Sequence, residues 1–447
     1  MRRKSHNAGF FLIERVCGKL REHSKKIKNF QKWVVRFSLT AGFCWIIFFS
    51  YYAVVESIPD TIRLEKGETG NFDFDLPITG ELKQEGIEVF GNQSPTVDSE
   101  KIKLDLNQSF SLKSQQQGNY IMSCKLFGLF QIKDVSVEVM EKAQVVPCGV
   151  PVGIYVKTDG VLIIGTGNVV GSDGMSHEPA ANLVKSGDYV KTVNEQLVEN
   201  KEDLVEKINQ CQGEPVILGI LREEEYIDLR VEPVKTDEDE YKLGIWVRDD
   251  LAGVGTLTFY DEQGNYGALG HPVSDMDTGI KVSMSEGSLY EAEIAGITKG
   301  EKGNPGEISG VITYLDQYRL GNVEENTNKG IYGKLEKLPT ENGEPSYYPI
   351  GLKQSIEEGE ATIISSVSGE RREYTINITN MDYNSENKGI LFQVTDPELL
   401  ELTGGVIQGM SGSPIIQNGK VIGAVTHVFV QDATKGYGIF IENMLKH

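Results

Sequence analysis

Cysteine is scarce in this chain of 447 residues, which has five, at positions 17, 44, 124, 148 and 211. They form no Cys-x-x-Cys pair and no cluster with histidine, so the usual patterns of a structural zinc site are missing. A disulfide between Cys148 and Cys211 stays open, but so few cysteines indicate a fold that does not depend on cross-links. We therefore expect no metal and no other cofactor.

Positive charge is rare outside the first 36 residues. The formal net charge is −21, yet residues 1–36 contain 11 Lys or Arg against 2 Glu. The rest of the chain is strongly acidic, which argues against binding to nucleic acid. An acidic surface favours solubility and, for any charged partner, a basic one.

Charged residues are absent from Phe37 to Val55, a run of 19 mostly apolar residues. A helix of this length just spans the hydrocarbon core of a bilayer, and the basic segment before it places the N-terminus inside. A cleaved signal peptide is the rival interpretation, but its basic region would be unusually long and no small-residue cleavage site follows. We predict a cytoplasmic segment over 1–36, a signal anchor over 37–55, and residues 56–447 outside the cytoplasm.

Long amphipathic helices are scarce after the anchor. Residues 56–143 contain short alternating runs separated by turn residues, such as Ile102–Leu106 and Val135–Val139, and this pattern predicts a small β-sandwich or barrel. Residues 237–447 are rich in glycine and alternate in the same way, and their number suits two packed six-stranded barrels. The predicted fold class is mainly β.

The segment between these two, residues 144–236, combines strand-like runs with an amphipathic helix over Lys201–Gln210. It resembles a PDZ domain in the residues Pro179, Ala180, Leu183, Gly187, Asp188, Val190, Val193 and Asn194. The resemblance implies that Val152, Gly153 and Ile154 form the loop whose backbone N–H groups hold the carboxylate of a peptide C-terminus. A PDZ fold that acts only as a rigid spacer is the alternative.

The stretch Gly409-Met410-Ser411-Gly412-Ser413-Pro414 near the C-terminus carries the strongest chemical signal. Glycines on both sides of a serine allow a tight turn and leave backbone N–H groups free. A serine hydroxyl beside free N–H donors suits acyl transfer, because those donors stabilise the developing oxyanion. A glycine- and serine-rich hairpin loop without chemistry is the alternative.

A serine nucleophile needs a base within hydrogen-bond reach and a group that orients the base. Of six histidines, four are less suited by position: His6, His23, His177 and His447. His271 lies in a Gly-His-Pro turn at a predicted strand end, where its ring can point into a cleft, and it is the preferred base. His427, inside the strand that follows the serine, is the second candidate.

The serine stretch resembles the Gly-Asp-Ser-Gly-Gly-Pro motif of chymotrypsin-like peptidases. Residues 423–427 and 436–441 resemble the substrate-binding strand and the closing strand of the same enzymes. Together with the anchor and the PDZ-like segment, nearly the whole chain resembles the sporulation serine peptidases of endospore-forming bacteria. The resemblance implies a chymotrypsin-like double β-barrel over residues 237–447.

The family's catalytic triad corresponds to His271, Asp396 and Ser411. The same resemblance implies an oxyanion hole made by the backbone N–H groups of Gly409 and Ser411. Asp396 stands much closer to the serine than in ordinary chymotrypsin order. The other candidates to orient the base are Asp275, Asp277 and Asp316.

The resemblance also implies a membrane-anchored endopeptidase that acts between the forespore and mother-cell membranes during sporulation. Such a protease cleaves itself, then cuts a regulatory subunit of a membrane-embedded protease complex and so starts processing of a sigma factor. The expected partners are its own chain, that subunit and the membrane, with no nucleic acid. Two alternatives stay open: a PDZ scaffold with a degenerate peptidase-like domain, and a protease that degrades unfolded proteins broadly.

Overall fold

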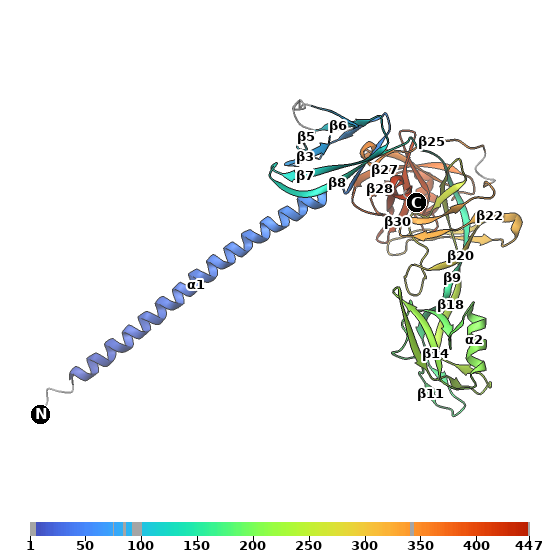
Figure 1. Cartoon of the computed structure of the whole chain (residues 1–447), viewed down its shortest axis with the longest axis horizontal. Coiled ribbons are helices and arrows are strands. Elements are labelled where there is room, and N and C mark those ends of the chain that lie inside the picture. The colour runs from blue at the N-terminus through green and yellow to red at the C-terminus, as the bar shows by residue number, and fades with distance from the viewer. Residues whose placement is uncertain (1–5, 75, 84–85, 92–100, 340–343, 446–447) are drawn as a thin grey trace.

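The computed structural model describes residues 6–445 except 75, 84–85, 92–100 and 340–343, with side chains from residue 32 onward. Figure 1 shows a long helix, a small β-domain at the end of that helix, a central β body that holds the C-terminus, and a separate lobe. Most of the elements are strands, so the predicted fold class, mainly β, is confirmed.

Helix α1, His6–Ser57, contains the predicted membrane anchor. Its segment Lys32–Ser57 is long and apolar enough to cross a membrane, and the most apolar part of this segment is not buried inside the protein. Trp45 and Phe48 on this segment are 62% and 61% exposed. A helix that satisfies its own backbone hydrogen bonds and presents apolar side chains all around suits a lipid environment.

The small β-domain is a sandwich of two sheets, as predicted for residues 56–143. The sheets have the strand orders β1-β8-β7-β3-β5 and β2-β6-β4. Alternate side chains of both sheets, among them Leu64, Leu112 and Val137, are buried between them, because successive residues of a strand point to opposite faces. The strands are β1 Thr61–Glu65, β2 Thr69–Phe72, β3 Ile78–Lys83, β4 Ile87–Phe90, β5 Lys101–Asp105, β6 Phe110–Ser114, β7 Gly118–Leu126 and β8 Phe130–Met140.

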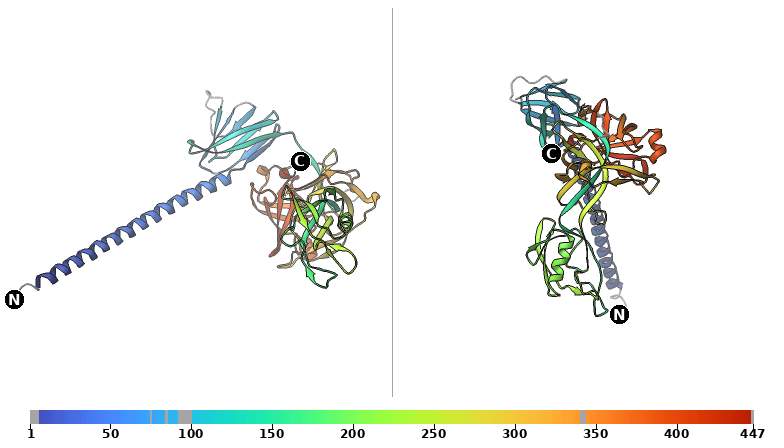
Figure 2. Two further views of the ribbon diagram at one scale, coloured as in Figure 1. Left: turned by 60° about the horizontal axis from the view of Figure 1, so that its bottom comes forward. Right: turned by 90° about the vertical axis from the view of Figure 1, so that its right-hand side faces the viewer.

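Two long antiparallel strands, β9 (Gln144–Thr166) and β18 (Ile245–Tyr260), run from the central body into the PDZ-like lobe. The lobe is inserted between them and stands apart from the body, as Figure 1 and the right-hand view of Figure 2 show. Its own core is formed by residues such as Val190, Leu204 and Ile220. The other elements of the lobe are β10 Val169–Val170, β11 Ser176–His177, β12 Tyr189–Val193, β13 Gln196–Leu197, α2 Lys201–Gln210, β14 Val216–Arg222, β15 Glu225–Val231, β16 Val234–Lys235 and β17 Tyr241–Lys242.

The first half of the central body is an open half-barrel, which differs from the closed barrel that we predicted. Its core contains Val146, Val152 and Val156 of β9 beside Leu257 of β18. Residues 144–157, which we assigned to the PDZ-like segment, thus belong to the body, because one uninterrupted strand crosses the domain border. The remaining elements of this half are β19 Asn265–Ala268, β20 Met284–Thr298, β21 Glu307–Ile312, η1 Asp316–Tyr318, β22 Arg319–Asn322, β23 Glu325–Thr327, β24 Gly330–Lys334 and β25 Tyr348–Pro349.

The second half of the body is a closed barrel with the strand order β26-β27-β28-β31-β30-β29. Its interior contains Ile376, Phe392 and Phe440, all fully buried. A closed barrel leaves no free sheet edge, so it is a rigid support for the loops between its strands. Its elements are η3 Lys353–Ser355, β26 Gly359–Ser365, β27 Arg372–Met381, β28 Ile390–Val394, α3 Pro397–Thr403, β29 Pro414–Gln417, β30 Lys420–Phe429, β31 Asp432–Phe440 and α4 Ile441–Met444.

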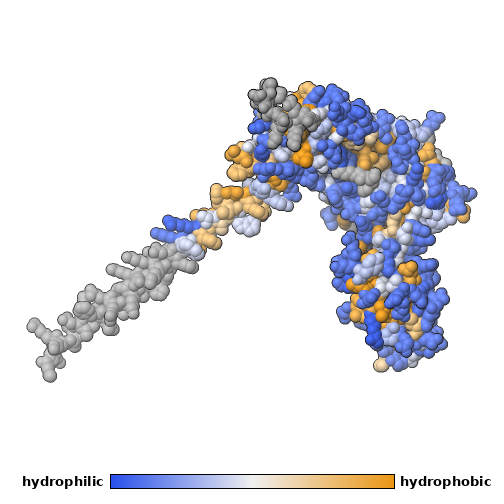
Figure 3. All heavy atoms as spheres, in the orientation of Figure 1, coloured by the Kyte–Doolittle hydropathy of each residue, from blue (hydrophilic) through white to orange (hydrophobic). Residues whose placement is uncertain are grey.

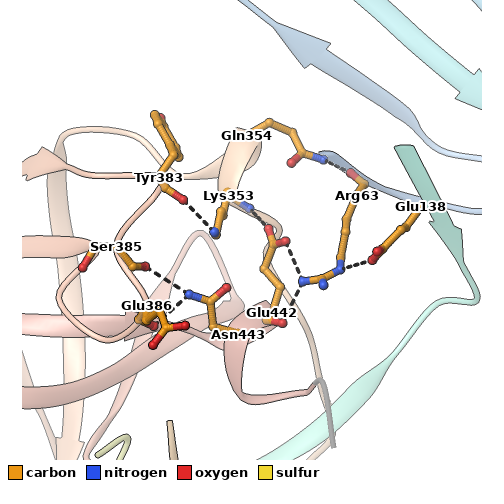
Figure 4. A network of polar contacts seen from close by, with 9 residues as sticks. All are labelled: Arg63, Glu138, Lys353, Gln354, Tyr383, Ser385, Glu386, Glu442 and Asn443. Atoms are coloured by element: carbon orange, nitrogen blue, oxygen red, sulfur yellow. Dashed lines mark hydrogen bonds and ion pairs between the residues drawn. The ribbon is translucent and has the colours of Figure 1, made fainter. Parts of the chain in front are cut away.

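A buried polar network fastens the small β-domain to the closed barrel (Figure 4). Arg63 of β1 donates from Nη1 to the backbone carbonyl of Glu442 at 2.7 Å and to its carboxylate at 3.1 Å. Arg63 Nε binds Glu138 at 2.9 Å, and the backbone N–H of Lys353 donates to Glu442 at 2.5 Å. Because the Arg63 and Glu442 side chains are 7% and 4% exposed, this contact fixes one domain against the other.

Two of the cysteines hydrogen-bond to backbone carbonyls in different parts of the described chain. The thiol of Cys148 donates to the Val146 carbonyl in the body, whereas Cys211 donates to the Lys207 carbonyl in the lobe. The disulfide between Cys148 and Cys211 that the sequence left open is therefore not formed, because the two thiols lie in different domains.

Candidate active site

Ser411 lies on a short loop between helix α3 and strand β29. The neighbouring residue Met410 is fully buried in the core of the closed barrel, and its N–H donates to the Ile407 carbonyl at 3.2 Å. On the other side, Gly412 N–H donates to Val425 of β30 at 2.7 Å. These contacts of the neighbouring residues fix the position of the loop. The Ser411 side chain is partly exposed.

Thr256 of β18 connects this loop to the half-barrel. Its backbone N–H donates to the Ser411 carbonyl at 3.2 Å, and its hydroxyl donates to the Gly409 carbonyl at 2.8 Å. Its own carbonyl accepts from Leu269 N–H at 3.3 Å, two residues before His271. A Cβ on Gly412 would lie 2.1 Å from the Thr256 carbonyl oxygen, so this close approach of the two half-bodies requires glycine.

His271 follows β19 through a tight turn in which Leu269 and Gly270 have φ values of 69° and 75°. A Cβ on Gly270 would lie 2.7 Å from the Thr426 methyl group, which shows how closely the turn packs against β30. His271 Nδ1 makes a 2.9 Å hydrogen bond with the Pro272 carbonyl. A carbonyl oxygen can only accept, so Nδ1 carries the proton and Nε2 keeps a free lone pair.

His427 lies beside the predicted base. The ring centroids of His271 and His427 are 5.6 Å apart, with the planes tilted by 50°. Burial, together with the smaller effects of the neighbouring His271 and Lys388, lowers the pKa of His427 to about 4. Burial also lowers the pKa of His271 and outweighs the hydrogen bond to Pro272, which raises it. Both imidazoles are therefore neutral at pH 7, the form that a general base requires.

Ser411 is brought to this pair of histidines by strand β30. Its hydroxyl donates to the Thr426 carbonyl at 2.8 Å, and His427 is the next residue of that strand. Thr426 is held in turn by hydrogen bonds from its own hydroxyl to the carbonyls of Asn387 and Tyr437. In the described part of the chain Ser411 makes no hydrogen bond with His271, so the hydroxyl must turn from Thr426 toward the imidazole before it can react.

The backbone N–H groups of Gly409 and Ser411 are the predicted oxyanion hole. The adjacent N–H groups of Met410, Gly412 and Ser413 all donate to backbone carbonyls. Among the described residues, by contrast, Gly409 N–H and Ser411 N–H have no acceptor. Two free donors on either side of a buried residue are available for the oxygen of a bound carbonyl.

Asp396, the predicted acidic member of the triad, does not reach His271 in this structure. It is the N-cap of α3, where its carboxylate accepts from the N–H groups of Glu398 and Leu399 at 3.0 Å and from Thr375 N–H at 3.2 Å. Asp396 follows strand β28, whereas Asn387, the residue that holds Thr426, precedes it. The strand between them is roughly 20 Å of extended chain. We correct the prediction accordingly: the carboxylate caps a helix, and the Pro272 carbonyl accepts the hydrogen bond from His271 Nδ1.

The other acidic candidates are also occupied or distant. Asp275 is fully buried and forms an ion pair with Arg248 of β18. Asp277 binds the same guanidinium at 2.8 Å, and Asp316 is the first residue of η1. The loop after His271 is thus fastened to the PDZ-like lobe by Arg248, and none of these carboxylates hydrogen-bonds His271 among the described residues.

The predicted carboxylate-binding loop Val152-Gly153-Ile154 is wrong, because these residues lie in the middle of β9. They pair with Gly253–Gly255 of β18 on one side and with Leu289–Glu291 of β20 on the other, so the segment is an internal strand. The open sheet edge of the lobe is instead at Ile245–Arg248, which pairs only with β9 among the described strands. Helix α2 lies next to this edge, and Lys201 N–H at its start donates to Asp249 at 2.9 Å.

Two functional positions were not predicted from the sequence. Thr256 and Thr426 position the nucleophile through backbone and hydroxyl contacts, and no local pattern marks a threonine for such a task. The open edge had a signal that we did not use, the run Leu243-Gly244-Ile245 directly before a strand. An apolar-glycine-apolar run at this place is typical of a PDZ carboxylate-binding loop.

The fold and the site define a class: a serine peptidase of mainly β structure with an inserted PDZ-like lobe and an N-terminal apolar helix. Residues 239–445 match the family model described as SpoIVB peptidase S55, and this part of the chain is similar to that family. No curated protein matches the chain.

Solved structures with distant similarity include a PDZ domain and a protease. The PDZ domain of the SdrC-like protein from Listeria monocytogenes aligns at 16% identity and a TM-score of 0.17, covering 21% of this chain and 90% of that chain. The Rv3671c protease of M. tuberculosis in its inactive form aligns at 14% identity and a TM-score of 0.24, covering 43% of this chain and 80% of that chain. Its active form aligns at 13% identity and the same TM-score of 0.24, covering 43% and 71%.

Proposed function

We propose that this serine peptidase is a membrane-anchored endopeptidase of sporulation that cleaves itself and then a protein regulator. The observation that carries the catalytic part is the contact of both half-bodies at Thr256, which joins the Ser411 loop to the His271 turn. The family of the peptidase domain supports the biological part.

In the proposed reaction, Ser411 turns from Thr426 and transfers its proton to His271 Nε2 as its oxygen attacks the peptide carbonyl. The N–H groups of Gly409 and Ser411 bind the oxyanion. His271 then returns the proton to the leaving amine, and the acyl group stays on Ser411 until a water molecule, deprotonated by the same imidazole, hydrolyses it. The Pro272 carbonyl stabilises the proton on Nδ1 throughout, as a carboxylate does in a full triad.

The proposed location follows from helix α1. We infer that it anchors the chain with residues 1–36 in the cytoplasm, because basic residues precede the apolar segment, and with the peptidase outside. In a spore-forming cell this is the space between the forespore and mother-cell membranes. The proposed substrates are the protein's own N-terminal region and a regulatory subunit of a membrane-embedded protease complex, whose loss starts sigma factor processing.

The proposed role of the lobe is to bind the end of a peptide chain. A peptide strand would add to the open edge at Ile245–Arg248, beside α2, and the turn at Gly244 would receive its carboxylate. Arg248 also binds Asp275 in the loop that follows His271. The lobe therefore presents a bound peptide on a strand that contacts the catalytic half-barrel.

A covalent label tests the catalytic proposal. A fluorophosphonate probe should modify the full chain at Ser411, as located by mass spectrometry, and Ser411→Ala should abolish both the label and self-cleavage. Ser413→Ala is the matched control, because Ser413 is fully buried and its hydroxyl has no hydrogen-bond partner among the described residues. That variant should keep the label.

One observation favours a second candidate, a PDZ scaffold with a degenerate peptidase-like domain: the Ser411 hydroxyl is bound to Thr426 and not to His271. Catalytic hydrogen bonds are often formed only with substrate bound, so we prefer the enzyme. No label on a correctly folded chain would favour the scaffold, whereas self-cleavage that persists in Ser411→Ala would reject Ser411 as the nucleophile.

A further inference from the structure

The turn between β7 and β8 in the small β-domain exposes three large apolar side chains. Phe127, Leu129 and Phe130 are 69%, 77% and 68% exposed. Single exposed apolar residues are ordinary, but a cluster of this kind on one turn usually marks a contact surface. The run Leu126–Phe130 contains no charged residue, so nothing on the turn itself opposes transfer out of water.

The backbone of the turn is held in an unfavourable conformation. Phe127 has a φ of 51°, a left-handed conformation that costs free energy for any residue other than glycine. The turn is fixed by hydrogen bonds from Phe127 N–H to the Pro77 carbonyl at 3.3 Å and from Leu129 N–H to the Leu126 carbonyl at 3.1 Å. The turn therefore holds the exposed Phe127 side chain in a defined place.

The turn is also fixed relative to the end of helix α1. The ammonium of Lys133 in β8 donates to the carbonyl of Ile58 at 2.5 Å and to that of Val55 at 3.5 Å, and it pairs with Asp60 at 2.7 Å. Ile58, just past the end of the helix, is buried in the core of the β-domain. The helix and the hairpin therefore form one rigid unit.

The strand register places the turn on the side of the domain that faces the helix. Strand β1 pairs with β8 in parallel from Thr61 opposite Ser136. The part of β8 before Ser136 runs beyond the start of β1, back toward α1, by about 20 Å. Figure 1 shows β7 and β8 at the end of α1, and Figure 3 shows hydrophobic atoms on the part of α1 nearest the domain and on the adjoining end of the domain.

We propose that the Phe127–Phe130 turn inserts into the surface of the same membrane that α1 crosses. This rests on the proposed membrane anchoring. The occupant is a phospholipid bilayer and not a protein, because the apolar segment of α1 ends at Ser57, next to the turn, and a membrane around that segment must meet whatever lies beside its end. Aromatic and leucine side chains on a turn are suited to the boundary between headgroups and acyl chains.

The insertion gives the protein a second contact with the bilayer. A chain held only by one helix can rotate about that helix and tilt. A chain held by the helix and a rigid turn cannot, because Lys133 couples the two. The proposal thus assigns the small β-domain the task of setting the height and orientation of the peptidase above the membrane.

An environment-sensitive dye tests the proposal on the full chain in vesicles of phosphatidylcholine and phosphatidylglycerol. The chain carries Ser411→Ala to prevent self-cleavage, and Cys17, Cys44 and Cys211 are replaced by Ala so that only an introduced cysteine is labelled. The test variant is Leu129→Cys. The matched control is Gln117→Cys, an exposed position at the opposite end of β7.

We expect the dye at position 129 to emit at shorter wavelength and to be quenched several-fold more by nitroxide-labelled lipid than the dye at 117. Equal, weak quenching at both positions, with the protein still resistant to carbonate extraction, would overturn the inserted turn while leaving the anchor intact. Extraction of the protein by carbonate would overturn the anchor itself. A blue-shifted dye at 129 that lipid quenchers do not reach would assign the turn to a protein partner and would equally reject the proposal.

Discussion

At the scale of single residues, the site depends on threonines that have no chemical role of their own. Thr426 holds the nucleophile through its carbonyl, and Thr256 holds the loop on which the nucleophile stands. Both are almost completely buried, so water does not compete for their hydrogen bonds. The reactivity of Ser411 is therefore set by backbone positions in two different strands.

Replacing Thr256 by Val should loosen the serine loop. The substitution keeps the shape but removes the hydrogen bond to Gly409, which we expect to lower the free energy of unfolding by about 1 kcal/mol and to reduce kcat more than it changes KM. Thr258→Val is the control, because the buried Thr258 hydroxyl has no partner among the described residues. Urea unfolding and peptidase assays on both variants check this, and equal effects of the two substitutions would contradict it.

The histidine pair should make the fold sensitive to acid. The pKa of His427 in the folded chain is about 4 against an ordinary 6.5, so between these values the unfolded chain binds more protons. Stability is therefore fully present above pH 6.5 and falls as the pH drops toward 4. We expect His427→Phe in the Ser411→Ala background to flatten this dependence, measured as unfolding free energy against pH. An unchanged slope would show that His427 is not the group responsible.

At the scale of elements, the border between the PDZ-like lobe and the peptidase is not a linker but a pair of strands. Strands β9 and β18 each contribute one half to the lobe and one half to the half-barrel. The ladder shifts register between Arg248 and Asp250, where residues 158–161 of β9 have no partner in β18. Two paired strands are still stiffer than a flexible connection. In the closed barrel, helix α3 leads directly into the Ser411 loop.

The cap of α3 gives Asp396 a structural task that can be separated from catalysis. We expect Asp396→Ala to lower the unfolding free energy by about 1 kcal/mol, whereas Asp396→Asn should be nearly neutral, because asparagine caps helices as well as aspartate does. Thermal or urea unfolding checks both. If the Asn variant were as stable as the wild type but inactive toward substrate, the carboxylate would belong to the catalytic machinery after all.

At the scale of the whole molecule, a buried ionic contact among the described residues joins the peptidase to the small β-domain. Arg63, Glu442 and Glu138 form it (Figure 4). Within the barrel, Asn443, the residue after Glu442, donates to the carbonyls of Ser385 and Glu386 at 3.2 and 2.9 Å. The same loop contains Asn387, which binds Thr426. The domain interface and the nucleophile thus share one loop.

Breaking this contact should be costly. Arg63→Met leaves the Glu442 carboxylate buried without its cation, which we expect to lower the unfolding free energy by about 3 kcal/mol. Lys66→Met is the control, because the Lys66–Glu141 pair is 41% and 61% exposed and should contribute about 1 kcal/mol or less. Denaturant unfolding of both variants in the Ser411→Ala background checks this. Equal losses of unfolding free energy would show that the buried pair contributes no more to stability than the exposed one.

Much of the molecule could be predicted because its signals are local. The uncharged run 37–55, the alternation in 56–143 and the turn at Gly409–Ser413 each depend on neighbouring residues only. The errors concern partners distant in sequence: Val152–Ile154 resembles a loop by position but is paired on both sides, and Asp396 matches a family position but caps its own helix. The local pattern also could not predict that the first barrel is open, because closure of a barrel depends on which strands pair with each other.

The order of the chain, with an apolar helix, a small β-domain, a PDZ-like segment and a serine peptidase, was determined by sequence alone, since hydropathy, periodicity and motif are properties of contiguous residues. Only the tertiary structure decided which histidine tautomer faces the site, what orients it, and where the lobe presents an open edge. The open edge depends on hydrogen bonds between strands far apart along the chain. The tautomer depends on a bond to the adjacent Pro272 carbonyl, which only the folded turn brings into place. Such bonds are settled only when the whole core closes and every buried backbone group must find a partner.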